Sequence, residues 1–227
     1  MAAESYQQSS ATVQLEAGKN FIHTDVLPKP EDTILDLGCG TGELSAYLAE
    51  LVGPREGNSN QFEGMGSEKF DIIFSNFVLH WIPEKSEAFR NMLNSLKPGG
   101  KVAIQYVDAL PPLLVSSLEI LNPETHEQLK NKLHLVKRDD VDLICTTAGF
   151  TVVRSYYARK TVNVYPSVES LLQWLVSTSQ GVFDLQLVTQ ERIKLLLQKF
   201  GNPPFDFTAN AFDCKLVAVK PKSSQTL

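Results

Sequence analysis

The sequence has few cysteines and no long apolar segment. Its 227 residues include three cysteines, Cys39, Cys145 and Cys214, which lie far apart in the chain. This odd number argues against a disulfide framework and predicts a reducing compartment, which we take to be the cytoplasm. No apolar run reaches the roughly 18 residues that a transmembrane helix needs, so no membrane span is predicted. The N-terminus also lacks the basic and then apolar regions of a signal peptide.

Basic surfaces and metal-ligating motifs are missing as well. The net charge is −5 and the pI is about 5.4, which argues against a nucleic-acid partner or an anionic membrane surface. The four histidines form no H-E-x-x-H and the cysteines no C-x-x-C, so no metal site is predicted. No G-x-S-x-G elbow offers a serine nucleophile. A hydrophobic content of 43% in a chain of this length suits one α/β domain over residues 1–227.

A glycine-rich stretch near residue 40 is the strongest feature of the chain. The apolar run that begins at Ile34 leads into Gly38, Gly40 and Gly42, and a helix-forming segment follows. This order predicts a buried strand, a tight turn and a helix N-terminus. Asp36 falls at the carboxyl end of the strand, where open α/β sheets bind ligands.

The glycine spacing separates two kinds of nucleotide site. A dinucleotide-binding turn reads G-x-G-x-x-G, and Glu43 stands where its third glycine would be. The spacing therefore disfavours an NAD(P)-binding oxidoreductase. The alternative without a ligand is a glycine turn with a purely structural role, although three alternating glycines destabilise a strand–helix junction that has no use for them.

A second motif follows another predicted strand, Phe70 to Phe77. The segment F-S-N-F-V-L-H-W-I occupies residues 74–82, and a helix is predicted from Glu84 to Leu96. A K-P-G-G turn over residues 97–100 then leads into a strand from Lys101 to Val107.

Taken together, the D-x-G-x-G-x-G order of residues 36–42 and this second motif resemble the class I S-adenosylmethionine (SAM)-dependent methyltransferases. The late segments Y-P-S-V-E-x-L-x-x-W-L and L-V-A-V-K look most like small-molecule O-methyltransferases of the trans-aconitate, malonyl-carrier-protein and juvenile hormone acid type. The resemblance implies a Rossmann-like α/β fold, with a mostly parallel sheet and an antiparallel last strand. It also implies SAM as the cofactor and a small-molecule methyl acceptor, such as a carboxylate.

The resemblance carries site roles onto matching residues. Cofactor binding falls to the glycine turn and the end of the second strand: Asp36, Gly38, Cys39, Gly40, Thr41, Gly42 and Asn76. On the substrate side, it points to His80, Trp81 and Trp174, each of which can also be read as a packing or structural residue. No catalytic residue is assigned, although His80 is the candidate general base if the acceptor is a hydroxyl or an amine. A carboxylate acceptor needs no base.

One interval departs from the family pattern. Gly53 to Lys69 holds 17 residues with four glycines and no strand or helix signal. In the family this interval contains a second strand that ends in a ribose-binding acid, a helix and a third strand, which together need roughly 40 residues. We therefore infer that a βαβ unit is missing between Leu51 and Gln61, and that the sheet is shortened on one side. Glu56 and Glu63 are nearby acids, but neither is assigned the ribose role.

The loss of this unit leaves two hypotheses for function. The chain is either an active SAM-dependent methyltransferase or a methyltransferase-like chain without full activity, which is then a catalytically impaired isoform or a non-enzymatic binding scaffold. Its oligomeric state is left open.

The remaining segments are expected to serve the same domain. Residues 1–30 form an N-terminal arm with a helix over residues 12–27, and in the family such an arm often folds over the cofactor, here through Tyr6 and Gln14. Residues 108–137, with a helix from Glu124 to Leu135, and residues 160–207 are predicted substrate-covering insertions. A helix from Asp139 to Ala148 precedes a strand from Phe150 to Ala158, whose predicted partner is the strand from Asp213 to Lys220. Residues 221–227 are expected to be disordered.

Overall fold

The computed structural model describes residues 14–53, 68–110, 112–159, 164–179, 181–208 and 212–222. The chain forms two compact units. The sheet unit comprises Gly18–Asp108, Leu135–Ala158 and Cys214–Leu227, and the helical unit comprises Met1–Ala17, Ala109–His134 and Arg159–Asp213. The predicted insertions at 108–137 and 160–207 fall largely in the helical unit. Their role, like the single domain over 1–227, stays a prediction.

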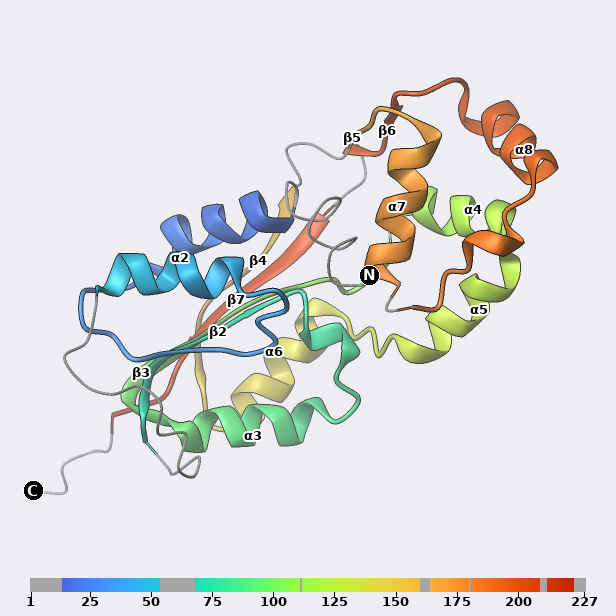
Figure 1. Ribbon diagram of the computed structural model, residues 1–227. Helices are drawn as coiled ribbons and strands as arrows, with labels where there is room; N and C mark the ends of the chain where they lie inside the picture. The colour runs from blue at the N-terminus through green and yellow to red at the C-terminus, as the bar shows by residue number, and fades with distance from the viewer. Residues whose placement is uncertain are drawn as a thin grey trace, which may run out of the picture. The chain divides into compact units, whose positions relative to one another are not determined.

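The sheet has five strands in the order β1-β2-β3-β7-β4 (Figure 1). The bounds are Ile34–Asp36 for β1, Phe70–Asn76 for β2, Leu96–Tyr106 for β3, Thr151–Arg159 for β4 and Phe212–Val219 for β7. β1, β2 and β3 are parallel, and β7 runs antiparallel to β3. This arrangement confirms the predicted Rossmann-like fold, including the pairing of the last strand with β4.

β1 forms one edge of the sheet. It pairs with β2 through Ile34–Ile72, Leu35–Ile73 and Asp36–Phe74, and among the described residues it has no second neighbour. Among the described residues the sheet therefore ends at β1, and the loss of a βαβ unit on this side stays a prediction. The interval that carries Glu56 and Glu63, residues 54–67, lies outside the described residues, as does the arm residue Tyr6.

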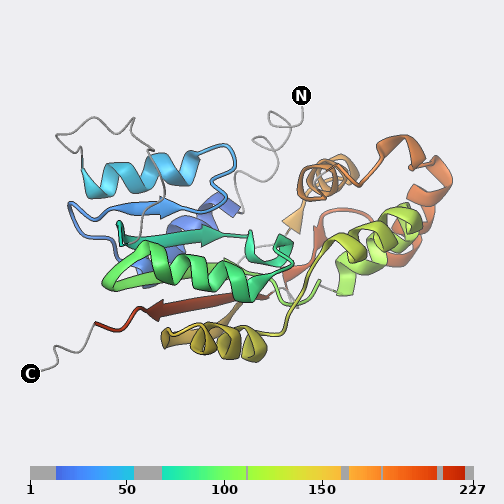
Figure 2. The same cartoon turned by 90° about the horizontal axis from the view of Figure 1, so that it is seen from below.

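Helices cover both faces of the sheet, as a parallel sheet requires. On one face lie α3 (Lys85–Ser95) and α6 (Arg138–Thr147), which stand in front of the strands in Figure 2. The buried residues on this face include Phe89, Val102, Ile104 and Leu216. On the opposite face, α2 (Glu43–Val52) and the segment of residues 18–26 bury Phe21, Ile22, Phe74 and Val217. β3 alternates between the two faces, with Ala103 on the second.

Two element ends differ from the sequence prediction. The N-terminal helix is α-helical over residues 14–21, continues as a π-helix over Ile22–Val26 and ends at Leu27, which has a φ of 45°, before the prolines. The predicted turn at residues 97–100 is instead part of β3, because Gly99 donates to the Lys220 carbonyl and Lys220 donates to the Gly100 carbonyl. The pairing with β2 passes from Phe70–Leu96 directly to Ile72–Lys101, so residues 97–100 form a bulge within β3.

The helical unit contains α4 (Pro112–Leu121), α5 (Pro123–Lys132), α7 (Val168–Thr178) and α8 (Gln190–Phe200), with a short β5–β6 pair (Val164–Tyr165 and Phe205–Asp206). α4 is a helix that the sequence analysis does not predict within residues 108–137. Proline is favoured in the first helical turn, where its missing N–H costs nothing. Ser167 caps α7, and its side chain accepts from the Ser170 amide. Ser170 completes the capping box, although its side chain is not the usual Glu or Gln.

Candidate active site

The glycine turn follows β1 in the predicted conformation. Gly38, Gly40 and Gly42 have φ values of 79°, 56° and 90°, a region that other residues rarely adopt. The turn is closed by a hydrogen bond of 3.0 Å from the Gly42 amide to the Cys39 carbonyl. At its start, the Leu37 amide donates to the Phe74 carbonyl of β2 at 2.8 Å. The turn is therefore anchored to the neighbouring strand.

The three glycines face different surroundings. A Cβ atom on Gly38 would overlap with Val78, a residue of the segment that follows β2. At Gly40 and Gly42 a Cβ would have no protein atom of the described chain within 4 Å. Gly38 thus allows the two loops to pack together, whereas Gly40 and Gly42 leave open space beside their backbone. A ligand can approach the turn closely on that side.

Asp36 ends β1 next to this open turn. Its Oδ2 atom accepts a hydrogen bond of 2.5 Å from the hydroxyl of Ser45, in the first turn of α2. Burial raises the pKa of the Asp36 carboxyl above its usual value of 3.8, and the Ser45 hydrogen bond opposes the shift. A partly buried carboxylate held in this way gains from a cationic hydrogen-bond donor. Nearby, Cys39 exposes a free thiol, and the Thr41 hydroxyl donates to Glu43.

Asn76 occupies the end of β2, the strand beside β1. It lies in register with Gln105 of β3, and the preceding register pair, Asp36–Phe74, places it just beyond the end of β1. Among the described residues its buried Oδ1 atom has no hydrogen-bond partner. The structure therefore places Asp36, the glycine turn and Asn76 at the carboxyl ends of β1 and β2, and their part in binding a ligand stays a prediction.

His80 and Trp81 lie in a 3₁₀ turn, Leu79–Trp81, shortly after Asn76. His80 is buried, at 7% exposure, and its ring centroid is 5.5 Å from that of Trp81. The Lys85 ammonium, also buried, donates to the Ile82 carbonyl at 2.8 Å and so fixes the end of this segment. Burial lowers the pKa of Lys85.

Trp174 belongs to α7 in the helical unit. Its ring centroid is 5.4 Å from that of Tyr165, which in turn packs against Phe207 at 5.6 Å. These contacts give the tryptophan a packing role inside that unit. Its predicted contact with substrate stays a prediction.

Sequence reasoning missed several residues that shape this site. Ser45 holds Asp36, Val78 packs on Gly38, and Lys85 fixes the segment after His80. Only Ser45 could have been found from the sequence, because a hydroxyl in the first turn of the helix after the glycines can reach back to the end of the strand.

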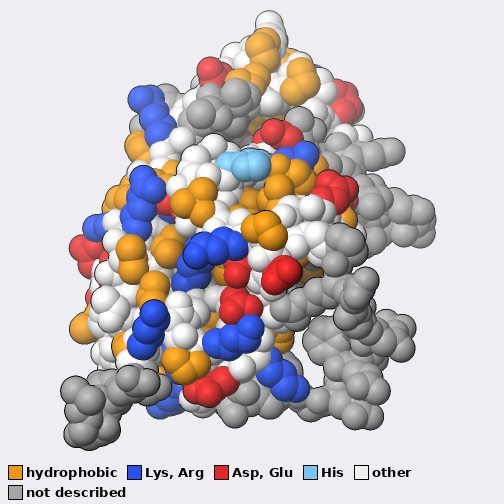
Figure 3. Space-filling model, turned by 90° about the vertical axis from the view of Figure 1, so that its left-hand side faces the viewer, with side chains coloured by type: hydrophobic (Ala, Val, Ile, Leu, Met, Phe, Trp, Pro, Cys, Tyr) orange, Lys and Arg blue, Asp and Glu red, His pale blue; other side chains and the backbone are white. Residues whose placement is uncertain are grey.

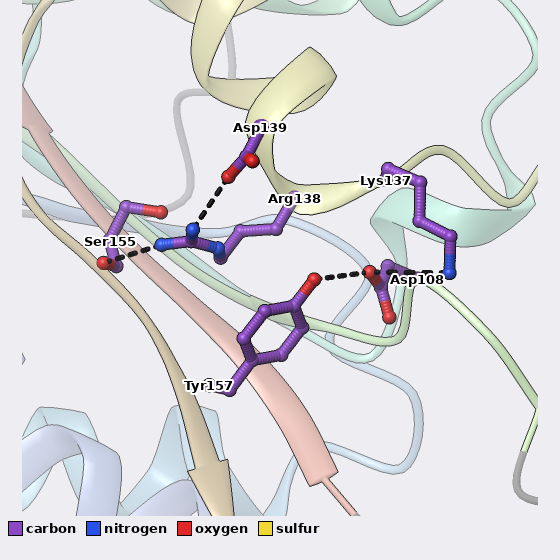
Figure 4. Close-up of polar contacts among 6 residues, drawn as sticks. All are labelled: Asp108, Lys137, Arg138, Asp139, Ser155 and Tyr157. Carbon is purple, nitrogen blue, oxygen red and sulfur yellow. Dashed lines mark hydrogen bonds and ion pairs between the residues drawn. The ribbon is translucent and has the colours of Figure 1, made fainter.

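A further polar cluster lies beyond the end of β3. Asp108 accepts a hydrogen bond of 2.8 Å from the Tyr157 hydroxyl and lies 3.8 Å from the Lys137 ammonium (Figure 4). The Arg138 guanidinium stands 4.9 Å from the Tyr157 ring centroid and donates to the Ser155 carbonyl. These contacts join β3, α6 and β4 within the sheet unit, so the cluster has a structural role.

The composition of the visible surface adds one observation. On the face drawn in Figure 3, Lys and Arg side chains alternate with Asp and Glu, and neither sign forms a continuous field among the coloured residues.

In the part of the chain that the structure describes, no helix is long and apolar enough to cross a membrane. Within the same residues, no group of three His, Cys, Asp or Glu side chains is placed to hold a metal ion.

Comparison with known proteins identifies the family. A family model described as a methyltransferase domain matches residues 14–155, more than half of the chain. The chain belongs to this methyltransferase family. Its cofactor is SAM, and the residues present fit the methionine part of that molecule. Gly40 and Gly42 offer open backbone, and the Asp36 carboxylate and the unpaired Asn76 Oδ1 atom lie beside them.

The relatives include methyltransferases of two named kinds. Trans-aconitate 2-methyltransferase of Deinococcus radiodurans is 29% identical over 99 residues, which cover 34% of this chain and 38% of the relative. Malonyl-[acyl-carrier protein] O-methyltransferase 1 of Ilyobacter polytropus is 25% identical over 216 residues, which cover 80% of this chain and 77% of the relative. The match to the first relative thus spans well under half of its length.

Solved structures agree on the fold. A sarcosine dimethylglycine methyltransferase from Galdieria sulphuraria matches with a TM-score of 0.51 and 14% identity, over 91% of this chain and 86% of that one. Phosphoethanolamine N-methyltransferase 2 of Haemonchus contortus, solved in complex with SAM, matches with a TM-score of 0.55 and 16% identity, over 97% and 57%. At these identities the similarity concerns the fold alone.

Proposed function

We propose that this protein is a SAM-dependent methyltransferase that acts on a small-molecule acceptor. The observation that carries the proposal is the open backbone at Gly40 and Gly42, between the carboxylate of Asp36 and the amide of Asn76. A glycine turn whose backbone is covered by other protein atoms would have a structural role. Here no described protein atom lies within 4 Å of the Cβ positions of Gly40 and Gly42.

The roles of the residues follow from their chemistry. The Asp36 carboxylate accepts hydrogen bonds from the α-ammonium of the methionine part of SAM. The backbone of residues 38–42, including Cys39 and Thr41, lies against this part of the molecule, and Asn76 supplies an amide. SAM itself supplies a methyl group on a sulfonium leaving group. The protein then has to position the acceptor in line with that group and exclude water.

For the acceptor we propose a small carboxylic acid. The support comes from relatives named for trans-aconitate and for malonyl-carrier protein. A carboxylate nucleophile needs no general base, which agrees with the burial of His80 at 7% exposure and its packing on Trp81. If the acceptor is a hydroxyl or an amine, His80 is the residue that would take its proton.

A cytoplasmic location is part of the same proposal. Its support is the small number of cysteines, all three of them free.

The second candidate is a methyltransferase-like chain with impaired catalysis. It is favoured by the position of β1, a three-residue strand with one neighbour among the described residues. The alignment with the malonyl-carrier-protein enzyme is 216 residues long, but it contains only 80% of the 227 residues of this chain. Part of the aligned stretch therefore has no counterpart in this chain.

Calorimetric titration of the purified chain with SAM tests the proposal. We expect saturable binding that is lost in Gly40→Val, because the added side chain fills the open space beside the turn. Gly201→Val is the matched control. Gly201 also has a positive φ, 80°, and no described atom within 4 Å of its Cβ position, but it ends α8. Failure of a cooperatively folded wild-type chain to bind SAM would reject the first candidate and leave the second.

A further inference from the structure

The segment of residues 18–26, which we call the strap, crosses one face of the sheet. Phe21, Ile22 and Val26 are fully buried there, and the Phe21 ring centroid lies 6.2 Å from that of Phe74 in β2. The Lys101 ammonium of β3 donates to the Val26 carbonyl. The strap therefore packs along the apolar layer that also contains α2.

One buried carboxylate fixes the strap to the far edge of the sheet. The side chain of Asp25 has no exposed surface, and its Oδ1 atom lies 2.8 Å from the Arg154 guanidinium. Its Oδ2 atom accepts hydrogen bonds from the Tyr156 hydroxyl at 2.8 Å and from the Thr24 hydroxyl at 2.5 Å. Arg154 also stands over the Tyr156 ring, 4.5 Å from its centroid. Both partners belong to β4, 129 and 131 residues further along the chain.

The opposite end of the strap touches the candidate cofactor residues. Gly18 packs against Asn76 and against Leu44 of α2: a Cβ atom at Gly18 would lie 2.6 Å from Leu44 Cδ1 and 3.3 Å from Asn76 Nδ2. Leu44 is in the first turn of α2, directly after the glycine turn. Between the two ends, His23 forms a hydrogen bond with Tyr47 of α2. The strap thus connects β4 with Asn76 at the end of β2 and with α2, the helix that follows the glycine turn.

We propose that Asp25 is a positioning residue for the cofactor site. By fixing the strap to Arg154 and Tyr156, it holds Gly18 against Asn76 and Leu44, and so keeps the amide of Asn76 and the helix after the glycine turn in the orientation that SAM requires. This inference rests on the proposed function, since it assigns the strap to the same SAM site.

The chemistry of the contact explains why a carboxylate stands at this position. Asp25 accepts from two hydroxyls through Oδ2, and its Oδ1 atom, which accepts no hydrogen bond, forms an ion pair with the Arg154 guanidinium. Burial, together with the hydrogen bond to Asp25, raises the pKa of Tyr156 to about 12, so the phenol remains a donor over the working range of pH. Asparagine at this position would place an NH₂ group against donors and could accept through one oxygen only.

Two substitutions with a neighbouring control test the proposal. Tyr156→Phe removes one hydrogen bond to Asp25, and Asp25→Asn removes the charge. The control is Tyr157→Phe, on the same strand, because the Tyr157 hydroxyl donates to Asp108 and not to the strap. We would measure the dissociation constant for SAM by calorimetry, and hydrogen exchange of the amides of residues 18–26 without SAM.

We expect SAM to bind about 5- to 150-fold more weakly to Tyr156→Phe and Asp25→Asn, the usual range for coupling between two sites, with faster exchange of the strap. Tyr157→Phe should match the wild type in both measurements. Faster exchange with an unchanged dissociation constant would mean that the network only stabilises the fold, and would overturn the proposal. If Asp25→Asn does not fold, Tyr156→Phe alone decides. Absence of SAM binding by the wild type would reject the proposed function itself, and the positioning role with it.

Discussion

The glycine turn makes a quantitative prediction, because two of its glycines are constrained by different forces. Alanine at Gly38 meets both an unfavourable backbone conformation and the side chain of Val78, whereas alanine at Gly40 meets only the first. We therefore expect Gly38→Ala to destabilise the protein clearly more than Gly40→Ala, although both positions have a positive φ and belong to the same turn.

The size of the difference follows from the structure. A non-glycine residue in the left-handed region costs about 1–2 kcal/mol, which both variants incur. At Gly38 the new Cβ also overlaps Val78 Cγ2 and lies 3.0 Å from Cγ1 and 3.2 Å from Cβ, so a flexible chain end cannot simply move aside. Forcing an extra carbon into packed atoms costs about 1–3 kcal/mol. We therefore expect losses of about 2–5 kcal/mol for Gly38→Ala and about 1–2 kcal/mol for Gly40→Ala.

Urea unfolding of the two variants, of Val78→Ala and of the double variant Gly38→Ala/Val78→Ala provides the assay. Val78→Ala removes Cγ1 and Cγ2, the two atoms that the new Cβ would meet most closely, so it should be less harmful in the Gly38→Ala background than in the wild type. The double-mutant cycle should give a coupling of about 1–3 kcal/mol in the stabilising direction. Equal losses at the two glycines, or strictly additive effects of the double variant, would refute the packing of Gly38 against Val78.

Three further predictions concern single groups. The Asp36 carboxyl must be ionised to accept hydrogen bonds from the SAM ammonium, and its pKa is raised. In a calorimetric pH series the affinity for SAM should therefore fall as the pH decreases through a range above 3.8. Asp36→Asn should bind SAM weakly and without this pH dependence. Burial raises the pKa of Asp71, but its bonds to Lys97 and the Thr33 amide outweigh this and lower it. The ionised Asp71 carboxylate therefore stabilises the fold fully at pH values above 3.8, and this stabilisation is lost as the pH falls through its lower pKa in the folded state. Because the Asp71–Lys97 pair is partly exposed, Asp71→Asn should reduce the pH dependence of the unfolding free energy in acid by less than about 1 kcal/mol. Ser167→Ala should cost about 1 kcal/mol in thermal unfolding through loss of the α7 cap, and an unchanged melting temperature would contradict the capping box.

The parts of the site that the sequence predicted depend on short-range signals. Asp36, the three glycines and Asn76 each lie at a strand end, and a strand end can be recognised from an apolar run that stops at polar or glycine residues. The parallel pairing of two such strands then brings their carboxyl ends together, which requires no knowledge of side-chain packing. The structure agrees with these predictions for that reason.

The features that the sequence did not predict depend on long-range contacts. Nothing in the residues around Asp25 indicates a partner on a strand 131 positions away, and the π-helix that presents it has no sequence signature. The overlap at Gly38 likewise depends on the path of the segment after β2. At α4 the failure was local, since Pro112 starts a helix that the sequence analysis does not predict.

The edge position of β1 leads to a last prediction. β1 has three residues and, among the described residues, one hydrogen-bonded neighbour. Its N–H and C=O groups on the other side therefore form no strand-to-strand hydrogen bonds within the described residues. Insertion of a strand–helix–strand unit of about 40 residues between Val52 and Gln61 should supply that neighbour and an acidic residue at its end. Unfolding free energy and SAM affinity should then rise together.

The control for this insertion is a Gly/Ser segment of the same length, which lengthens the connection without adding a strand. Loop closure costs only about 0.6 kcal/mol for each doubling of length, so this control should be close to the original chain in stability and should bind SAM no better. A restored unit that raised stability but left SAM affinity unchanged would show that Asp36, the glycine turn and Asn76 account for cofactor binding by themselves. The chain would then bind SAM fully without the missing βαβ unit, and our inference that the loss of this unit impairs function would be wrong.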